Sequence, residues 1–152
     1  MGLEKDIQQS SFSGQNQKAV INLIYTYHWV TERIKNILLE EDITLQQYNI
    51  LRILRGSDPR PLSTLMIRER MLDKMSDTSR IVDRLLLKKL VSKRLCNTDK
   101  RLVDVSITKE GKAMLQRIDE RDNEMNKVME MLNEEELISL NKLLDKLRGS
   151  GY

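Results

Sequence analysis

Two arginines one helical turn apart are the residues of this chain best suited to a specific chemical task. Arg80 and Arg84 lie in the segment MSDTSRIVDRLLLKKL, where a helical wheel gathers on one face Thr78, Ile81, Val82 and Leu85. The opposite face carries Ser76, Arg80, Asp83, Arg84 and Leu87. Arginine can pair with O6 and N7 of guanine, and serine can bond a base edge or a phosphate. An ordinary amphipathic helix with a solvated arginine face has the same pattern. The pattern of this helix alone therefore does not distinguish a DNA-reading helix from a solvated one.

The residues around this helix predict how it begins and what precedes it. Ser76 is the expected N-cap, and Asp77 adds a carboxylate at the positive end of the helix dipole. A short helix with Ser63 as its cap comes before it and ends near Met71. A short helix, a tight connection and a second helix with a polar start form the helix-turn-helix layout.

A two-stranded ribbon is predicted directly after the second helix. Residues 91–96 are compatible with a strand, residues 97–100 form a turn, and residues 102–107 alternate apolar and polar side chains. The first strand carries Lys93 and Arg94, which we expect to approach phosphates.

The predicted tip of this ribbon is charged. It carries Asp99, Lys100 and Arg101. A basic hairpin tip beside a groove-binding helix can enter the neighbouring minor groove, where the negative potential is concentrated. We expect Lys100 and Arg101 to make that contact, and Asp99 to orient Arg101 through a carboxylate–guanidinium bond.

The charge distribution agrees with a polyanionic partner for the middle of the chain. Between Arg52 and Lys112 there are 16 Lys and Arg and 8 Asp and Glu, a net charge of +8. The remainder has 26 − 16 = 10 basic and 23 − 8 = 15 acidic residues, a net charge of −5. A basic middle between acidic ends favours nucleic acid, although a basic patch is also compatible with a plain solvated face.

Composition limits the other classes of protein. The 152 residues suit one domain, and the single cysteine, Cys96, excludes an internal disulfide and is interpreted as structural. No run of about eighteen apolar residues and no signal-peptide pattern is present, so we expect a cytoplasmic protein. No phosphate loop, G-x-S-x-G, H-E-x-x-H or paired metal ligands occur, so we expect no enzyme activity, cofactor or metal.

Long helices are predicted on both sides of the basic middle. Apolar residues at spacings of three and four indicate a helix over 17–40, and Thr44 with Gln47 forms a capping-box pattern that opens the next one. A helix of about seven turns is expected from Thr108 to Leu132, followed by a last helix that Gly149 ends. These flanks, 17–40 and 108–148, have more apolar surface than one small lobe over 44–107 can bury, which predicts a dimerisation platform.

Three aromatic rings of the first long helix have two interpretations. Tyr25, His28 and Trp29 form a side stripe on it. They are either part of a helix–helix interface or the wall of a pocket for an aromatic or phenolic small molecule. His28 has no Cys or His partner that would make it a metal ligand.

Taken together, these motifs resemble the MarR (multiple antibiotic resistance regulator) family of bacterial transcription regulators. The family pattern is a helix-turn-helix ending near "vdrLekkGLv", a wing with D-x-R, and "LTekG" at the start of a long helix. This sequence has VDRL at 82–85, Lys88, Leu90-Val91, Asp99-Lys100-Arg101 and ITKEG at 107–111. Order and spacing hold over roughly 45–115, and the helical flanks fit the rest.

The resemblance implies a mainly α-helical chain of one domain, 1–152, with a small β-wing, which forms a winged-helix homodimer on a pseudo-palindromic operator in double-stranded DNA. By position, Ser76, Asp77, Ser79, Arg80 and Arg84 would meet the major groove or its phosphates, and the wing tip the minor groove. It also implies a repressor that a small lipophilic or phenolic effector releases, with Tyr25, His28 and Trp29 near the cleft. The alternative is a winged-helix module that docks an acidic protein.

Two positions depart from the family pattern. The usual glycine after the second helix is Lys89. Either a residue with a side chain takes a left-handed position there, at a cost of up to about 1 kcal/mol, or the helix ends differently and re-aims the wing slightly. Leu86 and Leu87 stand where polar residues are common, and either lie under the wing or extend an apolar surface.

Overall fold

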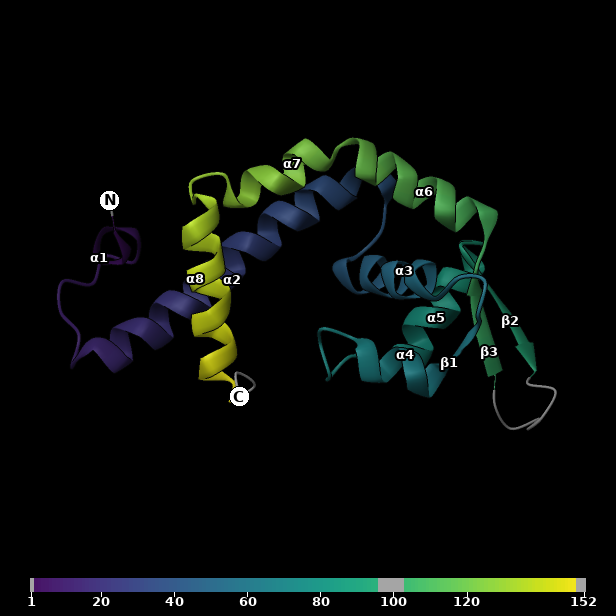
Figure 1. Ribbon diagram of the computed structural model, residues 1–152, viewed down its shortest axis with the longest axis horizontal. Coiled ribbons are helices and arrows are strands. Elements are labelled where there is room, and N and C mark those ends of the chain that lie inside the picture. Colours follow the sequence, from purple (N-terminus) through teal and green to yellow (C-terminus); the bar gives the residue numbers. More distant parts are fainter. Residues whose placement is uncertain (1, 96–102, 150–152) are drawn as a thin grey trace. The chain divides into compact units, whose positions relative to one another are not determined.

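The computed structural model describes residues 2–95 and 103–149. The chain consists of helices and one small sheet (Figure 1). The first half contains α1 (Leu3–Asp6), α2 (Gln15–Leu38), the 3-10 helix η1 (Leu39–Glu41), α3 (Leu45–Ser57), β1 (Leu62–Ser63) and α4 (Thr64–Arg70). The second half contains α5 (Thr78–Leu87), β2 (Val91–Leu95), β3 (Val103–Ile107), α6 (Lys109–Glu120), α7 (Asp122–Asn126), the 3-10 helix η2 (Lys127–Met129) and α8 (Glu134–Leu147).

The predicted fold class is confirmed. The chain is mainly helical with one small antiparallel sheet of order β1-β3-β2. The ribbon of β2 and β3 pairs Val91 with Ile107 and Leu95 with Val103, which is the hairpin that the alternation predicted. In Figure 1, α3, α4 and α5 gather in one lobe, and the two longer strands extend away from it.

Local sequence signals explain where the helices begin. The capping box at Thr44 is present: its hydroxyl accepts from the N–H of Gln47, and the Gln47 side chain accepts from the N–H of Thr44. Ser63 caps α4 as predicted. Asn133 and Glu136 form a second capping box at the start of α8.

The core of the lobe lies between its three helices and the sheet. Fully buried apolar side chains come from every element there, and they include Ile50, Leu51, Leu54, Leu62, Ile67, Val82, Leu85, Val91, Val105, Leu115 and Ile118. On α5 this core takes the face that the wheel predicted to point inward, including Thr78, which is 4% exposed. The opposite face of α5 is therefore left to solvent.

Ion pairs fasten α6 to the lobe. Lys112 pairs with Asp58 at 2.6 Å, and Arg55 pairs with Asp119 at 2.5 Å. Arg117 donates to both carboxylate oxygens of Glu41, at 3.1 and 2.9 Å, and this hydrogen bonding raises the pKa of Arg117 above its ordinary value. Because these pairs join α6 to three different segments, they hold the helix against the first unit along its length.

Three expectations about the elements were wrong or incomplete. A short helix, α1, precedes the first helix that the sequence predicted, in residues 1–16, where the spacing of apolar residues indicates no helix, and it buries Leu3. Leu62 and Ser63 form the third strand, β1, which pairs with β3 before α4 begins. The expected seven-turn helix after Thr108 is interrupted at Arg121, because no apolar residue stands between Ile118 and Met125 to hold the charged segment in one helix.

The chain divides into two compact units, Met1–Asp119 and Glu120–Tyr152. The first unit contains the lobe, the sheet and α2, and the second contains α7, η2 and α8. The predicted division into a lobe over 44–107 and dimerisation helices over 17–40 and 108–148 concerns an assembly of two chains and stays a prediction.

Candidate nucleic-acid interface

The helix that carries the two arginines begins one residue later than expected. Asp77, not Ser76, is the N-cap of α5, and its carboxylate accepts from the backbone N–H of Arg80 at 3.3 Å. Ser76 instead belongs to the preceding turn, because its N–H donates to the carbonyl of Asp73 at 3.2 Å. The prediction of Ser76 as the cap was therefore wrong, and the role falls to the next residue with an acceptor side chain.

The outward face of α5 presents the predicted arginines. Arg80, Asp83, Arg84 and Leu87 are exposed, whereas Val82 and Leu85 on the other face are fully buried. The guanidinium of Arg80 lies 3.5 Å from the Asp77 carboxylate, and its side chain is 80% exposed. Ser79 is exposed beside it. The burial of one face fixes which side chains the other face can offer to a ligand.

The two basic residues of β2 differ in their surroundings. The ammonium of Lys93 pairs with the carboxylate of Asp83, and the Lys93 side chain is only 29% exposed. Arg94 is exposed and stands opposite Asp104 in the β2–β3 register. Lys93 thus connects the strand to the arginine-bearing helix, while Arg94 is available at the surface.

The predicted wing tip lies outside the described residues. This applies to Asp99, Lys100 and Arg101, and also to Cys96. Their proposed contacts therefore stay predictions, and the structure defines only the two strands that lead to the tip.

At the joint between α5 and the ribbon, the structure shows the first of the two alternatives for Lys89, the left-handed one. Lys89 has φ 60°, and the helix ends in a Schellman motif: Lys89 N–H donates to the carbonyl of Leu86, and Leu90 N–H donates to that of Leu85, both at 3.0 Å. The first turn of α6 lies against this joint. Thr108 N–H donates to the carbonyl of Leu90 at 3.1 Å.

A glycine makes this close approach possible. A Cβ atom on Gly111 would lie 2.4 Å from the Leu90 carbonyl oxygen and 2.8 Å from Cγ1 of Ile107. Only a residue without a side chain fits there. The glycine of the ITKEG motif therefore sets how α6 approaches the end of α5.

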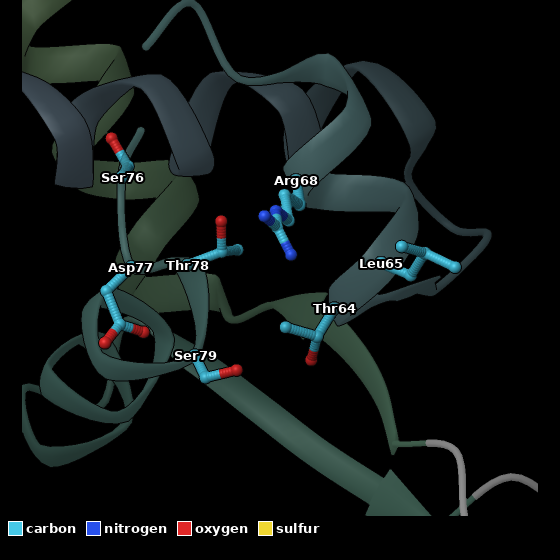
Figure 2. A pocket seen from close by; sticks show the side chains of 7 residues that line it. All are labelled: Thr64, Leu65, Arg68, Ser76, Asp77, Thr78 and Ser79. Carbon is cyan, nitrogen blue, oxygen red and sulfur yellow. The ribbon is translucent and has the colours of Figure 1, made fainter. Parts of the chain in front are cut away.

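A second group of polar residues at this surface was missed by the sequence reasoning. A pocket of about 400 Å³ lies between α4 and the start of α5. Figure 2 shows the side chains that line it. The predicted residues Ser76, Asp77 and Ser79 line this pocket. The other lining residues, which were not predicted, are Thr64, Leu65, Arg68 and Thr78. A helical wheel placed Thr78 on the buried face and gave no sign that Arg68, ten residues earlier, would lie across from it.

The three aromatic residues of α2 do not form one wall. Tyr25 and Trp29 line a pocket of about 470 Å³ together with Gly2 and Asp6 from the N-terminal segment. The ring of His28 instead meets that of Tyr27 edge-on, with 5.3 Å between centroids. The guanidinium of Arg33 lies over the Trp29 ring at 3.6 Å.

A more apolar pocket lies elsewhere in the first unit, between α2, α3 and the loop that follows α4. It measures about 420 Å³. Its lining comes from three segments and comprises Tyr27, Val30, Thr31, Ile34, Leu45, Gln46, Asn49, Met71, Leu72 and Asp73. This pocket lies beside Tyr27, whereas two residues of the predicted trio, Tyr25 and Trp29, line the other one. The role of the trio in binding an effector stays a prediction.

Two absences hold for the described residues. No group of three or more His, Cys, Asp or Glu side chains within 2–95 and 103–149 is arranged to hold a metal ion. No helix in the same residues is long and apolar enough to cross a membrane.

Three helices followed by a strand pair, with an exposed arginine face on the third helix of the lobe, define a winged helix-turn-helix protein. No family model and no curated protein matches the sequence. Solved structures do match. A MarR transcription factor from Planctomyces limnophilus is 28% identical with a TM-score of 0.68, covering 89% of this chain and 98% of its own.

Two further structures share the fold at lower identity. BpsR of Bordetella bronchiseptica, whose DNA binding is regulated by 6-hydroxynicotinic acid, is 19% identical with a TM-score of 0.75 and covers 86% of this chain and 98% of its own. A cysteine-to-serine variant of MarR from E. coli with operator DNA is 20% identical with a TM-score of 0.75. The match covers 97% of this chain and 99% of the MarR chain. The resemblance to the MarR family is confirmed, and the chain has the fold of these transcription regulators.

Proposed function

We propose that this protein is a dimeric, sequence-specific DNA-binding transcriptional regulator that acts as a repressor on a pseudo-palindromic operator. The observation that carries the proposal is the face of α5. Arg80 and Arg84 are exposed one turn apart, with Ser79 beside them, on a helix whose other face is fixed by burial of Val82 and Leu85. Such a helix, followed by a ribbon, suits the major groove.

Charge supports a nucleic-acid partner over a neutral one. The segment from Arg52 to Lys112, which contains α4, α5 and both wing strands, has a net charge of +8. Lysine and arginine side chains that neutralise phosphates release counterions, so the affinity for DNA should fall steeply as salt rises. The solved structures that the chain resembles are transcription regulators rather than enzymes.

Exposed apolar side chains support the homodimer. On the 24-residue helix α2 only Ile37 and Leu38 are buried, while Val20, Leu23 and Ile24 are 44% to 58% exposed. In the second unit, α8 has no buried residue, and Leu143 and Leu147 are 65% and 69% exposed. Apolar surface of this extent is usually covered by a partner, and a second copy would place two α5 helices on one duplex.

The proposal includes a small lipophilic or phenolic effector that releases the repressor from DNA. The pocket beside Tyr27 and Ile34 offers about 420 Å³ with a largely apolar lining, within the range of small-molecule sites. It joins α2 to the loop between α4 and α5, so a ligand there would act on the position of the DNA-reading helix. BpsR, one of the structures that share the fold, responds to a hydroxylated aromatic acid.

Selection of bound sequences from a random duplex library tests the proposal. We expect a palindrome whose half-sites lie one helical turn apart, about 34–36 Å. Arg80→Ala should then relax base preference at one position by about 1–3 kcal/mol. Equal losses on operator and random duplex would contradict base reading by Arg80. Duplex binding that stays weak even at low salt would favour the alternative, a module that docks an acidic protein.

A further inference from the structure

The hydroxyl of Thr78 is buried without a partner at the start of α5. Thr78 is 4% exposed, and among the residues that the structure describes nothing accepts from or donates to its Oγ1. The Oγ of Ser76 is also buried without a hydrogen-bond partner among these residues. Buried polar atoms are nearly always paired, so an unpaired hydroxyl beside a pocket indicates a group that binds there.

The surroundings of this hydroxyl are those of an anion site. Thr78 and Ser79 are the first residues of α5, and their backbone N–H groups have no acceptor within the helix. Arg68 reaches the same pocket from α4, and in Figure 2 its guanidinium extends toward Thr78. No ion pair holds Arg68 within the described part of the chain. A helix start with free N–H donors, a hydroxyl and a guanidinium together suit a phosphate group.

The one carboxylate in the pocket is already engaged. Asp77 accepts from the N–H of Arg80 and lies 3.5 Å from the Arg80 guanidinium. In Figure 2 its carboxylate points away from the Arg68 guanidinium, and it is not bonded to the Thr78 hydroxyl, which leaves that hydroxyl for an incoming anion.

We propose that Arg68, the Thr78 hydroxyl and the first N–H groups of α5 form a binding site for one phosphate group, and that this group is a backbone phosphate of the bound DNA. The inference rests on the proposed function. It adds an anchor that carries no base information but fixes the register in which Arg80 and Arg84 meet the bases. Arg68 is a contact from α4, separate from the base-reading face of α5.

Replacing single phosphates of a selected operator by uncharged methylphosphonates tests the site. The wild-type protein should lose affinity when the phosphate at any of several operator positions is replaced. At one of these positions the replacement should leave the affinity of Arg68→Ala unchanged. Arg68→Ala should weaken operator and random duplex alike, about 10-fold to 100-fold, and lower the slope of log affinity against log salt by about 1. Arg70→Ala, an exposed arginine of the same helix outside the pocket, should keep the wild-type pattern.

Thr78→Val gives a second variant of nearly the same shape. It removes only the hydroxyl, so the urea midpoint should be unchanged or higher while affinity for any duplex falls about threefold to tenfold. An Arg68→Ala protein that keeps the full methylphosphonate pattern, or a Thr78→Val protein with unchanged DNA affinity, would overturn the proposal.

Inorganic phosphate separates the two sources of the ligand. The amide resonances of Thr78 and Ser79 should shift on phosphate addition in the wild type and not in Arg68→Ala. If they do so while the methylphosphonate pattern is unchanged by Arg68→Ala, the site takes a free phosphate and its assignment to DNA is overturned. If no duplex binds at any salt concentration, the proposed function fails, and the Arg68-dependent phosphate shift alone upholds the anion site.

Discussion

Thr108 donates a hydrogen bond from its Oγ1 to the backbone carbonyl of Lys89, with 2.8 Å between the two oxygens. The same oxygen accepts from the N–H of Gly111 at 3.1 Å. The Thr108 hydroxyl thus caps α6 and also binds Lys89, the residue that follows the C-cap of α5. These bonds tie the end of α5 to the start of α6 and so help to fix the direction in which the chain leaves α5 for the ribbon.

Replacement of Lys89 by glycine should stabilise the protein. At φ 60° a side chain costs conformational energy that glycine avoids, so Lys89→Gly should raise the free energy of unfolding by about 0.5–1 kcal/mol. Urea denaturation measures the change. Lys88→Gly is the matched control, because Lys88 has φ −78° and should lose stability instead. A loss of stability in Lys89→Gly would show that the lysine side chain makes a compensating contact.

Addition of one methyl group at Gly111 should have the opposite effect. The new Cβ would meet the Leu90 carbonyl at 2.4 Å, and this backbone atom can move only if α6 shifts away from the joint. Gly111→Ala should therefore lower the free energy of unfolding by about 1–3 kcal/mol. Gly56→Ala serves as control, because no atom lies within 4 Å of its Cβ position in α3, and it should be stabilising. Equal urea midpoints for the two variants would contradict the close approach.

Signals that lie within a few residues of one another could be predicted from the sequence. The capping box at Thr44 and the order of strand, turn and strand in the ribbon needed only local spacing, and the resemblance to the family pattern drew attention to the backbone at Lys89. These features depend on hydrogen bonds and backbone angles of neighbouring residues, which the sequence determines directly.

Features that depend on the placement of separate elements could not be predicted in this way. The pocket that joins Arg68 to Thr78 exists because of the angle between α4 and α5, and strand β1 exists because two residues meet β3 some forty positions later. For the same reason the spacing of the aromatic trio could not show that Tyr25 and Trp29 line one pocket while the ring of His28 meets that of Tyr27.

The pair between Asp83 and Lys93 should position the wing. If charge alone mattered, Asp83→Asn would strengthen DNA binding, because it removes an anion from the surface that meets phosphates. We expect the reverse, a weakening of up to about fivefold, since an exposed ion pair of this kind contributes about 0.2–1 kcal/mol. Lys93→Gln should weaken binding similarly, and the two changes together should cost less than their sum. Tighter DNA binding by Asp83→Asn would refute the positioning role.

The N-terminal segment should detach from α2 in acid. The carboxylate of Glu4 pairs with Lys18, and that hydrogen bond, with a smaller one from its own backbone, lowers the pKa of Glu4 from its ordinary value of 4.5. Because the folded-state pKa is the lower one, the pair favours docking above pH 4.5, and this contribution is lost as pH falls through the lowered value. Trp29 reports the change, since it shares a pocket with Gly2 and Asp6.

Fluorescence of Trp29, the only tryptophan, should therefore show a transition below pH 4.5 that precedes acid unfolding. Glu4→Gln removes the titrating group, so its fluorescence at neutral pH should already resemble that of the acidified wild type and should stay flat until global unfolding. Glu69→Gln, which removes an exposed carboxylate on α4, should retain the wild-type transition. A transition that persists unchanged in Glu4→Gln would assign it to another acid and separate the docking of α1 from the Glu4–Lys18 pair.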